Sequence, residues 1–183
     1  NYYPNTPHII QNSLALVKNE LKKNNIKNIT IEAAAEHMID ANFEHLLEKL
    51  EVMPIKKQYL LIEMSYLQAS LNFDDAVQKI RNSQYFPILA HPERYHYLHH
   101  TSKYRLYKNT GILFQMNLLS LSTYYGKEIS DTAYKLLDKN LIDFVGTDVH
   151  NIRQLNALKN IKIKDKILKK LLPVLEKTTY NFG

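Results

Sequence analysis

Two short segments of the sequence carry side chains that can bind a metal ion. GTDVHN, residues 146–151, places Asp148 and His150 directly after an apolar run, and AHPERY, residues 90–95, places His91 after another. Residues two apart in an extended chain point to the same side, so Asp148 and His150 can face one ion. Carboxylate and imidazole ligands suit Mn, Zn or Fe(II), and the chain has no Cys for a thiolate site.

Other polar residues also stand late in apolar runs. They are Glu36, Glu63 and Asn117. In a parallel α/β fold the carboxyl ends of the strands meet at one rim. A lone Glu at a strand end is more often solvated or hydrogen-bonded, and an Asp-x-His segment can be only a turn, so the prediction depends on several residues together. We expect four of them to converge as metal ligands: Glu36, His91, Asp148 and His150.

Two arginines indicate a phosphorylated substrate. Arg94 follows His91 by three residues, and Arg153 follows His150 by three. A guanidinium group binds phosphate through two parallel hydrogen bonds, and a metal ion can activate water to cleave a phosphoester. The alternative for Arg153 is an exposed salt bridge near the start of a helix.

The elements that must position these residues alternate along the chain. Short apolar, β-rich runs cover residues 28–36, 58–65, 85–91, 112–119 and 142–147. Helical patterns lie between and beside them, at residues 7–23, 42–51, 73–83, 101–109 and 130–139. This alternation predicts a parallel sheet with right-handed crossovers, either a barrel or a doubly wound sheet. Without a repeat or a linker, we expect residues 1–183 to form one domain.

The excess positive charge is confined to the end of the chain. Residues 1–152 carry 16 basic and 16 acidic residues, whereas residues 153–183 carry 8 and 2. Leu and Ile recur at helical spacing in residues 162–177 with lysines between them, which predicts a packed surface helix with a solvated basic face. The alternative is a docking surface for an acidic partner. This confined charge argues against nucleic acid as a partner.

Two absences in the composition bound the protein further. There is no long apolar run, so no membrane span is expected. The lack of Cys excludes disulfides and suits a cytoplasmic location. The oligomeric state is left open.

The sequence resembles the PHP-domain protein-tyrosine phosphatases of the CpsB/CapC type, which occur with capsule and exopolysaccharide genes. The resemblance rests on AHPERY, GTDVHN and AAAEHM (residues 33–38), and it covers nearly the whole chain, including NYYPNTP and FQMNLLSL. It implies a distorted (β/α)7 TIM-like PHP barrel. It also implies a polynuclear site, typically with manganese but open to Fe, Zn or Mg, that dephosphorylates phosphotyrosine on a protein, commonly the tail of a bacterial tyrosine autokinase.

The resemblance also implies roles for individual residues. Arg94 would grip the phosphate, and Arg153 would assist it, although the spacing of the second arginine varies in the family. Glu63 matches a family glutamate at a strand end, with either a ligand or a structural role. The implied metal ligands are Glu36 as a shared carboxylate, Asp148 as a second carboxylate, and His91 and His150 as imidazoles.

The sequence departs from the family at its beginning. The family opens with a strand that ends in His-x-His and a second strand that ends in Thr/Ser-x-His, and neither precedes Asn1. The TPH at residues 6–8 is predicted to start a helix, because Pro followed by an amphipathic run is typical of a helix N-terminus. We therefore expect an N-terminally incomplete domain with five of the seven strand-helix units. Alone, it should be inactive or nearly so, with at most one weakly held ion.

Three functions remain open from the sequence. The first is a metal-dependent protein-tyrosine phosphatase, and the second is a PHP phosphoesterase acting on a small phosphorylated metabolite. The third is a noncatalytic module that binds an acidic partner through the basic C-terminal helix. His96, His99 and His100 in RYHYLHH either line the entrance of the site or, as is more common, belong to a solvated loop or helix cap. Tyr124 and Tyr125 can shape a rim for an aromatic substrate.

Overall fold

The computed structural model of the protein describes residues 5–99 and 102–183. Its centre is a sheet of five parallel strands that lie in chain order, β1-β2-β3-β4-β5. The strands are β1 (Glu36–Met38), β2 (Tyr59–Glu63), β3 (Phe86–Ala90), β4 (Leu113–Asn117) and β5 (Phe144–Gly146). The predicted α/β fold with five parallel strands is confirmed. Within the described residues the sheet is not closed, and β1 and β5 form its edges.

Helices connect the strands and extend beyond both edges of the sheet. The α-helices of the described residues are α1 (Pro7–Lys23), α2 (Phe43–Glu48), α3 (Phe73–Asn82), α4 (Lys103–Asn109), α5 (Lys127–Asp138), α6 (Ile152–Lys159) and α7 (Asp165–Phe182). Short 3-10 helices follow β3 and β4, namely η1 (Pro92–Arg94), η2 (His96–Leu98) and η3 (Leu118–Leu121).

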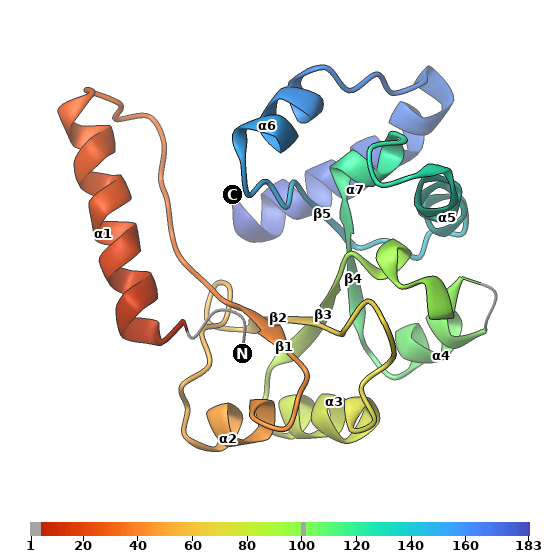
Figure 1. Ribbon diagram of the computed structural model, residues 1–183, viewed down its shortest axis with the longest axis horizontal. Helices are drawn as coiled ribbons and strands as arrows, with labels where there is room; N and C mark the ends of the chain where they lie inside the picture. Colours follow the sequence, from red (N-terminus) through yellow and green to blue (C-terminus); the bar gives the residue numbers. More distant parts are fainter. Residues whose placement is uncertain (1–4, 100–101) are drawn as a thin grey trace.

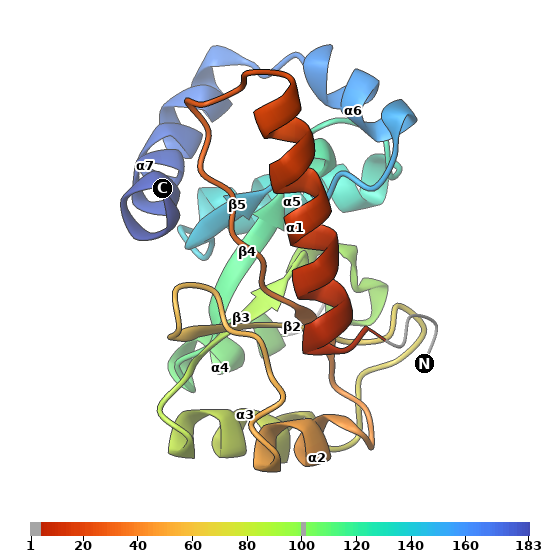
Figure 2. The same cartoon turned by 90° about the vertical axis from the view of Figure 1, so that its left-hand side faces the viewer.

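The handedness of the connections decides where the helices lie. Parallel strands in chain order with right-handed crossovers place their connecting helices on one face of the sheet. Figure 1 shows α2, α3, α4 and α5 around the outside of the curved sheet, with α7 beside β5. Helix α1 stands apart on the opposite side and buries none of its residues (Figures 1 and 2). One face of the sheet is therefore packed, and the other is left for different contacts.

The alternation of side chains along the strands separates these two faces. Leu60 and Ile62 of β2 are fully buried in the core under the helices, whereas Glu63 is only partly buried. Phe114 and Met116 of β4 behave in the same way as Leu60 and Ile62. Because successive side chains point to opposite faces of a strand, Glu63 points away from this core.

The first predicted strand is much shorter in the structure than the sequence indicated. Residues 28–35 have no regular structure, and Glu36 begins β1 rather than ending it. The ladder with β2 starts only where Glu36 pairs with Leu61, and Ala35 instead donates its amide to the carbonyl of Met53. A β-rich segment becomes a strand only where a neighbouring strand pairs with it, and no strand of the described residues pairs with residues 28–35.

The N-terminal helix begins as the sequence predicted. Thr6 caps α1 by accepting a hydrogen bond from the amide of Ile9, and Pro7 occupies the first turn. His8 lies in the first turn of α1, and its Nε2 atom is 3.0 Å from Asn12 Nδ2 on the next turn. TPH is therefore a helix start, as predicted.

The C-terminal helix α7 is a surface helix that packs through one side. Leu171 is 1% exposed, whereas its neighbour Leu172 is 46% exposed. Lys166 and Lys169 face solvent, and Lys170 pairs with Asp138 of α5. No described helix is both long enough and apolar enough to cross a membrane.

Replacing Leu171 with Ala should lower the free energy of unfolding by about 2–5 kcal/mol, because it leaves a cavity between α7 and the rest of the core. The adjacent Leu172→Ala variant is the matched control and should change it by less than about 0.5 kcal/mol. Urea unfolding followed by circular dichroism measures both values. Equal losses for the two variants would contradict the packing of α7.

Asp143, just before β5, ties three elements together through its carboxylate. It accepts hydrogen bonds from Lys108 of α4, from Lys177 of α7 at 2.9 Å, and from the amide of Phe114 in β4 at 2.9 Å. Burial opposes the charged form of Asp143, but the hydrogen bonds from Lys108, Phe114 and Lys177 outweigh it and lower the pKa. The ionised carboxylate therefore stabilises the folded state.

The Asp143→Asn variant should lose about 1–3 kcal/mol of unfolding free energy at pH 7, because two lysines lose their partner. A lowered pKa gives stability that is present above the unfolded value, about 3.9 for Asp, and is lost as the pH falls through the folded value. The difference from the wild type should therefore shrink below about pH 4. Urea unfolding between pH 3 and pH 7 tests this, with the exposed Asp131→Asn as a control that should change little at any pH.

Candidate active site

His91 is the buried centre of a group of ionisable side chains. It follows β3, is 2% exposed, and adopts a left-handed conformation with φ 35°, and Pro92 starts η1 directly after it. Its Nε2 atom lies 3.0 Å from Glu36 Oε1 and 3.6 Å from Glu63 Oε2. The hydroxyl of Tyr66 lies 3.3 Å from the same nitrogen. The structure thus brings residues from β1, β2 and the end of β3 to one point.

The charges at this point are only partly balanced. Burial of His91 opposes its protonation, but the hydrogen bond and negative charge of Glu36 outweigh burial and raise the pKa of His91. Burial, followed by the negative charge of Glu36, raises the pKa of Glu63. Two carboxylates therefore compete for one imidazole.

The same three residues fit a divalent cation. One ligand atom each from Glu36, Glu63 and His91 lies within 4.8 Å of the others. The second ring nitrogen of His91, Nδ1, is buried and has no hydrogen-bond partner among the described residues. Two carboxylates and an imidazole form a donor set that suits Mn, Fe(II) or Zn, and a cation would relieve the repulsion between the carboxylates.

Arg94 lies next to this group and is fixed on three sides. Its Nη1 donates to Asp148 Oδ2 at 2.8 Å, and Asn117 donates to the same oxygen at 3.0 Å. The guanidinium carbon lies 4.6 Å from the ring centre of Tyr66 and 4.4 Å from that of Tyr125. Both rings can stabilise the cation through their π faces. Because Tyr66 also contacts His91, the two groups of residues form one site.

Asp148 and His150 are close together, but not in the extended geometry that the sequence predicted. Asp148 has φ 51°, in the left-handed region, and its side chain is 11% exposed, whereas that of His150 is 71% exposed. His150 Nδ1 lies 3.2 Å from Asp148 Oδ1 and 2.9 Å from the backbone oxygen of Asp148. Gln154 accepts a hydrogen bond from the amide of His150, so the segment is a turn that leads into α6.

Arg153 lies away from the contacts that join the site. It is exposed in the first turn of α6. Among the described residues, it makes no hydrogen bond or ion pair with His91, Arg94 or Asp148. The structure therefore joins Arg94 to the other predicted residues and leaves Arg153 apart. The assignments of Glu36, His91, Asp148 and His150 as ligands, and of both arginines as phosphate binders, stay predictions.

Glu93 and Tyr66 are the residues of the site that the sequence did not indicate. Glu93 is fully buried, and its Oε1 accepts hydrogen bonds from the amide of Asn117 at 3.0 Å and from Ser120 Oγ at 2.7 Å. Burial raises the pKa of this carboxyl group. Glu93 thus anchors the turn after β3 to the end of β4. Neither residue has a periodic signal, because Glu93 lies in the three-residue helix η1 and Tyr66 in a bend after β2, and both are too short to show a period.

The remaining histidines separate into different environments. His37, adjacent to Glu36, is 8% exposed and accepts a hydrogen bond from the amide of Met53, and burial lowers its pKa to about 4. His37 is therefore neutral. Because it follows Glu36 directly in β1, its side chain lies on the opposite face of the strand. His96 and His99 lie near Glu128, and His100 falls outside the described residues.

The fold of the chain also occurs in a solved structure. The chain superposes with a TM-score of 0.77 and 22% identity on a crystal structure from the study of YwqE of Bacillus subtilis and CpsB of Streptococcus pneumoniae. That match covers 99% of this chain and 76% of the other, and it shows a shared fold. Those two proteins are described as unique metal-dependent tyrosine phosphatases.

Two curated proteins are related in sequence. The tyrosine-protein phosphatase YwqE of Bacillus subtilis is 26% identical over 157 residues, which are 84% of this chain. This match spans only 61% of the length of YwqE. The putative tyrosine-protein phosphatase CapC of Staphylococcus aureus is 28% identical over 184 residues, with 93% of this chain and 72% of CapC covered.

A family model matches most of the chain. The family described as capsular polysaccharide synthesis, CpsB/CapC, matches residues 2–170. This range includes all of the residues that meet around His91 and Arg94. The chain therefore belongs to the CpsB/CapC family of capsular polysaccharide synthesis.

Proposed function

We propose that this chain belongs to a metal-dependent protein-tyrosine phosphatase that hydrolyses phosphotyrosine on a protein. The observation that supports this most is the convergence of Glu36, Glu63 and His91 directly beside Arg94. A cation-binding group next to a guanidinium group is suited to phosphoester cleavage. The names of the relatives YwqE and CapC point to the same activity.

The metal ligands would come from two neighbouring groups of residues. Glu36, Glu63 and His91 would hold a divalent cation, for which we propose manganese, and Asp148 and His150 would contribute to a further ion. A cation there would lower the pKa of a coordinated water and offset negative charge on the phosphoryl group. The addition of Glu63 to the ligands expected from the sequence rests on its 3.6 Å distance from His91 Nε2.

The substrate would be bound through Arg94 and the two tyrosine rings beside it. Arg94 uses one of its N–H groups for Asp148 and retains others for phosphate oxygens. The rings of Tyr66 and Tyr125 flank its guanidinium group, so the same residues that orient Arg94 offer apolar surface to an aromatic leaving group. This favours an aryl phosphate over a small aliphatic one. Within this proposal, the protein substrate is the phosphorylated tail of a tyrosine autokinase that controls capsule or exopolysaccharide synthesis, and Arg153 assists at the rim.

The noncatalytic alternative receives less support from the contacts of α7. Lys170 pairs with Asp138, and Lys177 pairs with Asp143, so part of the basic face is already used within the chain. Lys166 and Lys169 remain exposed. Such a partly neutralised face fits a solvated surface better than a docking site for an acidic partner.

Replacing Glu63 with Gln should release the metal ion and lower turnover by more than about 100-fold, because a ligand to a buried cation is lost. The test uses the complete gene product with Mn²⁺, a phosphotyrosine peptide, a phosphoserine peptide and a set of small phosphates. Metal content is measured in parallel. The exposed Glu48→Gln in α2 is the matched control and should leave both readouts unchanged.

Three results would count against this proposal. Full metal content and turnover in Glu63→Gln would remove Glu63 from the ligands. Preference of the wild type for a small phosphate over the peptide would favour a metabolite phosphoesterase. No turnover of any phosphate by the metal-loaded wild type would leave no support for an enzyme.

Arg94→Lys should lower turnover of the phosphotyrosine peptide by about 10–1000-fold while metal content stays constant. The lysine keeps the positive charge but loses the planar group that binds phosphate through two hydrogen bonds. Steady-state kinetics and metal analysis measure the two effects separately. Arg105→Lys, on the exposed side of α4, is the control. Unchanged kinetics in Arg94→Lys would mean that Arg94 does not bind the phosphate.

A further inference from the structure

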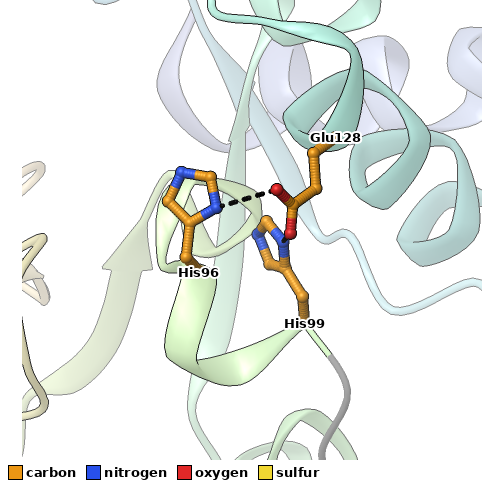
Figure 3. Close-up of side chains that lie close together, drawn as sticks. All are labelled: His96, His99 and Glu128. Carbon is orange, nitrogen blue, oxygen red and sulfur yellow. Dashed lines mark hydrogen bonds and ion pairs between the residues drawn. The ribbon is translucent and has the colours of Figure 1, made fainter.

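A second group of potential ligands lies outside the candidate active site. It consists of His96 in η2, His99 directly after η2, and Glu128 in the first turn of α5, and we refer to it as the His96–His99–Glu128 cluster. One ligand atom from each residue lies within 4.8 Å of the others. Figure 3 shows both imidazole rings turned toward the carboxylate.

The hydrogen bond on the far side of His99 determines which nitrogen faces Glu128. His99 Nε2 lies 2.6 Å from the backbone oxygen of Glu93. A carbonyl oxygen only accepts hydrogen bonds, so Nε2 must carry the proton and donate it. In a neutral imidazole the other nitrogen, Nδ1, then has a free lone pair.

This lone pair would point at another acceptor. His99 Nδ1 lies 3.1 Å from Glu128 Oε1, and the His99 side chain is only 1% exposed. A neutral His99 and an ionised Glu128 would present two lone pairs to each other, which is unfavourable because the His99 ring is almost fully buried, although Glu128 is exposed. A cation between them, either a proton or a metal ion, removes the conflict.

The positions of His96 and Glu128 favour a metal ion in this role. His96 Nδ1 lies 3.4 Å from Glu128 Oε2, so a second nitrogen approaches the same carboxylate. Bonds of about 2.0–2.2 Å to a tetrahedral zinc ion place neighbouring ligand atoms about 3.3–3.6 Å apart. The observed separations of 3.1 and 3.4 Å end on the two different oxygens of Glu128, and a set with one ligand atom from each residue lies within 4.8 Å, so small side-chain rotations would bring three ligands to these bond lengths. Metal-bound histidines also commonly donate their second N–H to a carbonyl oxygen, as His99 does to Glu93.

We propose that His96, His99 and Glu128 bind a zinc-class divalent ion that is separate from the metal of the candidate active site. Two imidazoles and one carboxylate supply three ligands, and the exposed sides of His96 and Glu128 admit water as the fourth. The ion joins η2 to the start of α5. Through the bond from His99 to Glu93, it also supports the turn that carries His91 and Arg94.

The test is zinc binding by the chain itself, measured without any assay of phosphatase activity. The metal-free protein is titrated with Zn²⁺ against a chromogenic chelator, and the histidine Nδ1 and Nε2 resonances are followed by nitrogen NMR. We expect the Nδ1 signals of His96 and His99 to shift with one equivalent of Zn²⁺. Co²⁺ in place of Zn²⁺ should give the absorption bands of a tetrahedral site.

The variants His96→Gln and Glu128→Gln change exposed side chains and should fold normally, which thermal unfolding can verify. Each should weaken this binding by more than about 100-fold, because loss of even an outer partner of a metal ligand costs about 10–100-fold. Glu36→Gln should retain the site, and His45→Gln, an exposed histidine of α2, controls for general histidine binding.

Two results would overturn the proposal. One is an absence of any shift in the Nδ1 signals of His96 and His99 at excess Zn²⁺, which would mean that a proton supplies the positive charge. The other is unchanged zinc stoichiometry and affinity in both His96→Gln and Glu128→Gln. Because Glu36→Gln separates the two groups of ligands, neither result depends on whether the protein is a phosphatase.

Discussion

The structure depends on one topological constraint, which is that all five strands run parallel in chain order. Right-handed crossovers then place the connecting helices on a single face, where they bury side chains such as Leu60 and Ile62. The opposite face and the rim of the sheet are free for polar side chains. Glu63 ends β2 and His91 follows β3 at this rim, and because β1 has only three residues, Glu36 at its start still reaches them.

The distribution of charge around the rim follows from this crowding. Arg94 and Asp148 neutralise each other, and Tyr66 and Tyr125 hold the guanidinium group in place. In contrast, Glu36 and Glu63 share the single imidazole of His91, and the pKa of Glu63 rises as a result of burial and of this neighbouring charge. The carboxylates of Glu36 and Glu63 therefore favour a bound cation. Beside them, the guanidinium group of Arg94 favours a bound anion. This pairing is what the chemistry of phosphate esters requires.

The segment of residues 91–99 links the candidate active site to the His96–His99–Glu128 cluster. His91 and Arg94 contribute to the first, and His96 and His99 contribute to the second. Glu93 lies between them. Its carboxylate accepts a hydrogen bond from the amide of Asn117 at the end of β4, and its backbone oxygen accepts one from His99. The bond from His99 to the backbone oxygen of Glu93 thus connects η2 to the turn that carries Arg94. A cation in the second cluster would act on the first through rigidity rather than through contact with the substrate.

The sequence by itself determined the kinds of elements and the motifs, because these depend on local patterns. Apolar runs of β-rich residues predicted five strands, Pro7 after Thr6 predicted the start of α1, and the residues around His91 and Asp148 indicated the site. The run before Glu36 was predicted wrongly as a strand, because pairing needs a neighbour that the local pattern does not reveal.

Only the tertiary structure decided which of the candidate residues meet. It placed Glu63 and Tyr66 against His91, joined Arg94 to Asp148 across 54 residues of the chain, and left Arg153 exposed. These contacts connect residues far apart in the sequence, so no local period encodes them. The left-handed turn at Asp148 likewise replaced the extended geometry expected from an apolar run. Local sequence fixes periodicity and turn chemistry, whereas the distance between two turns depends on how the whole sheet is wound.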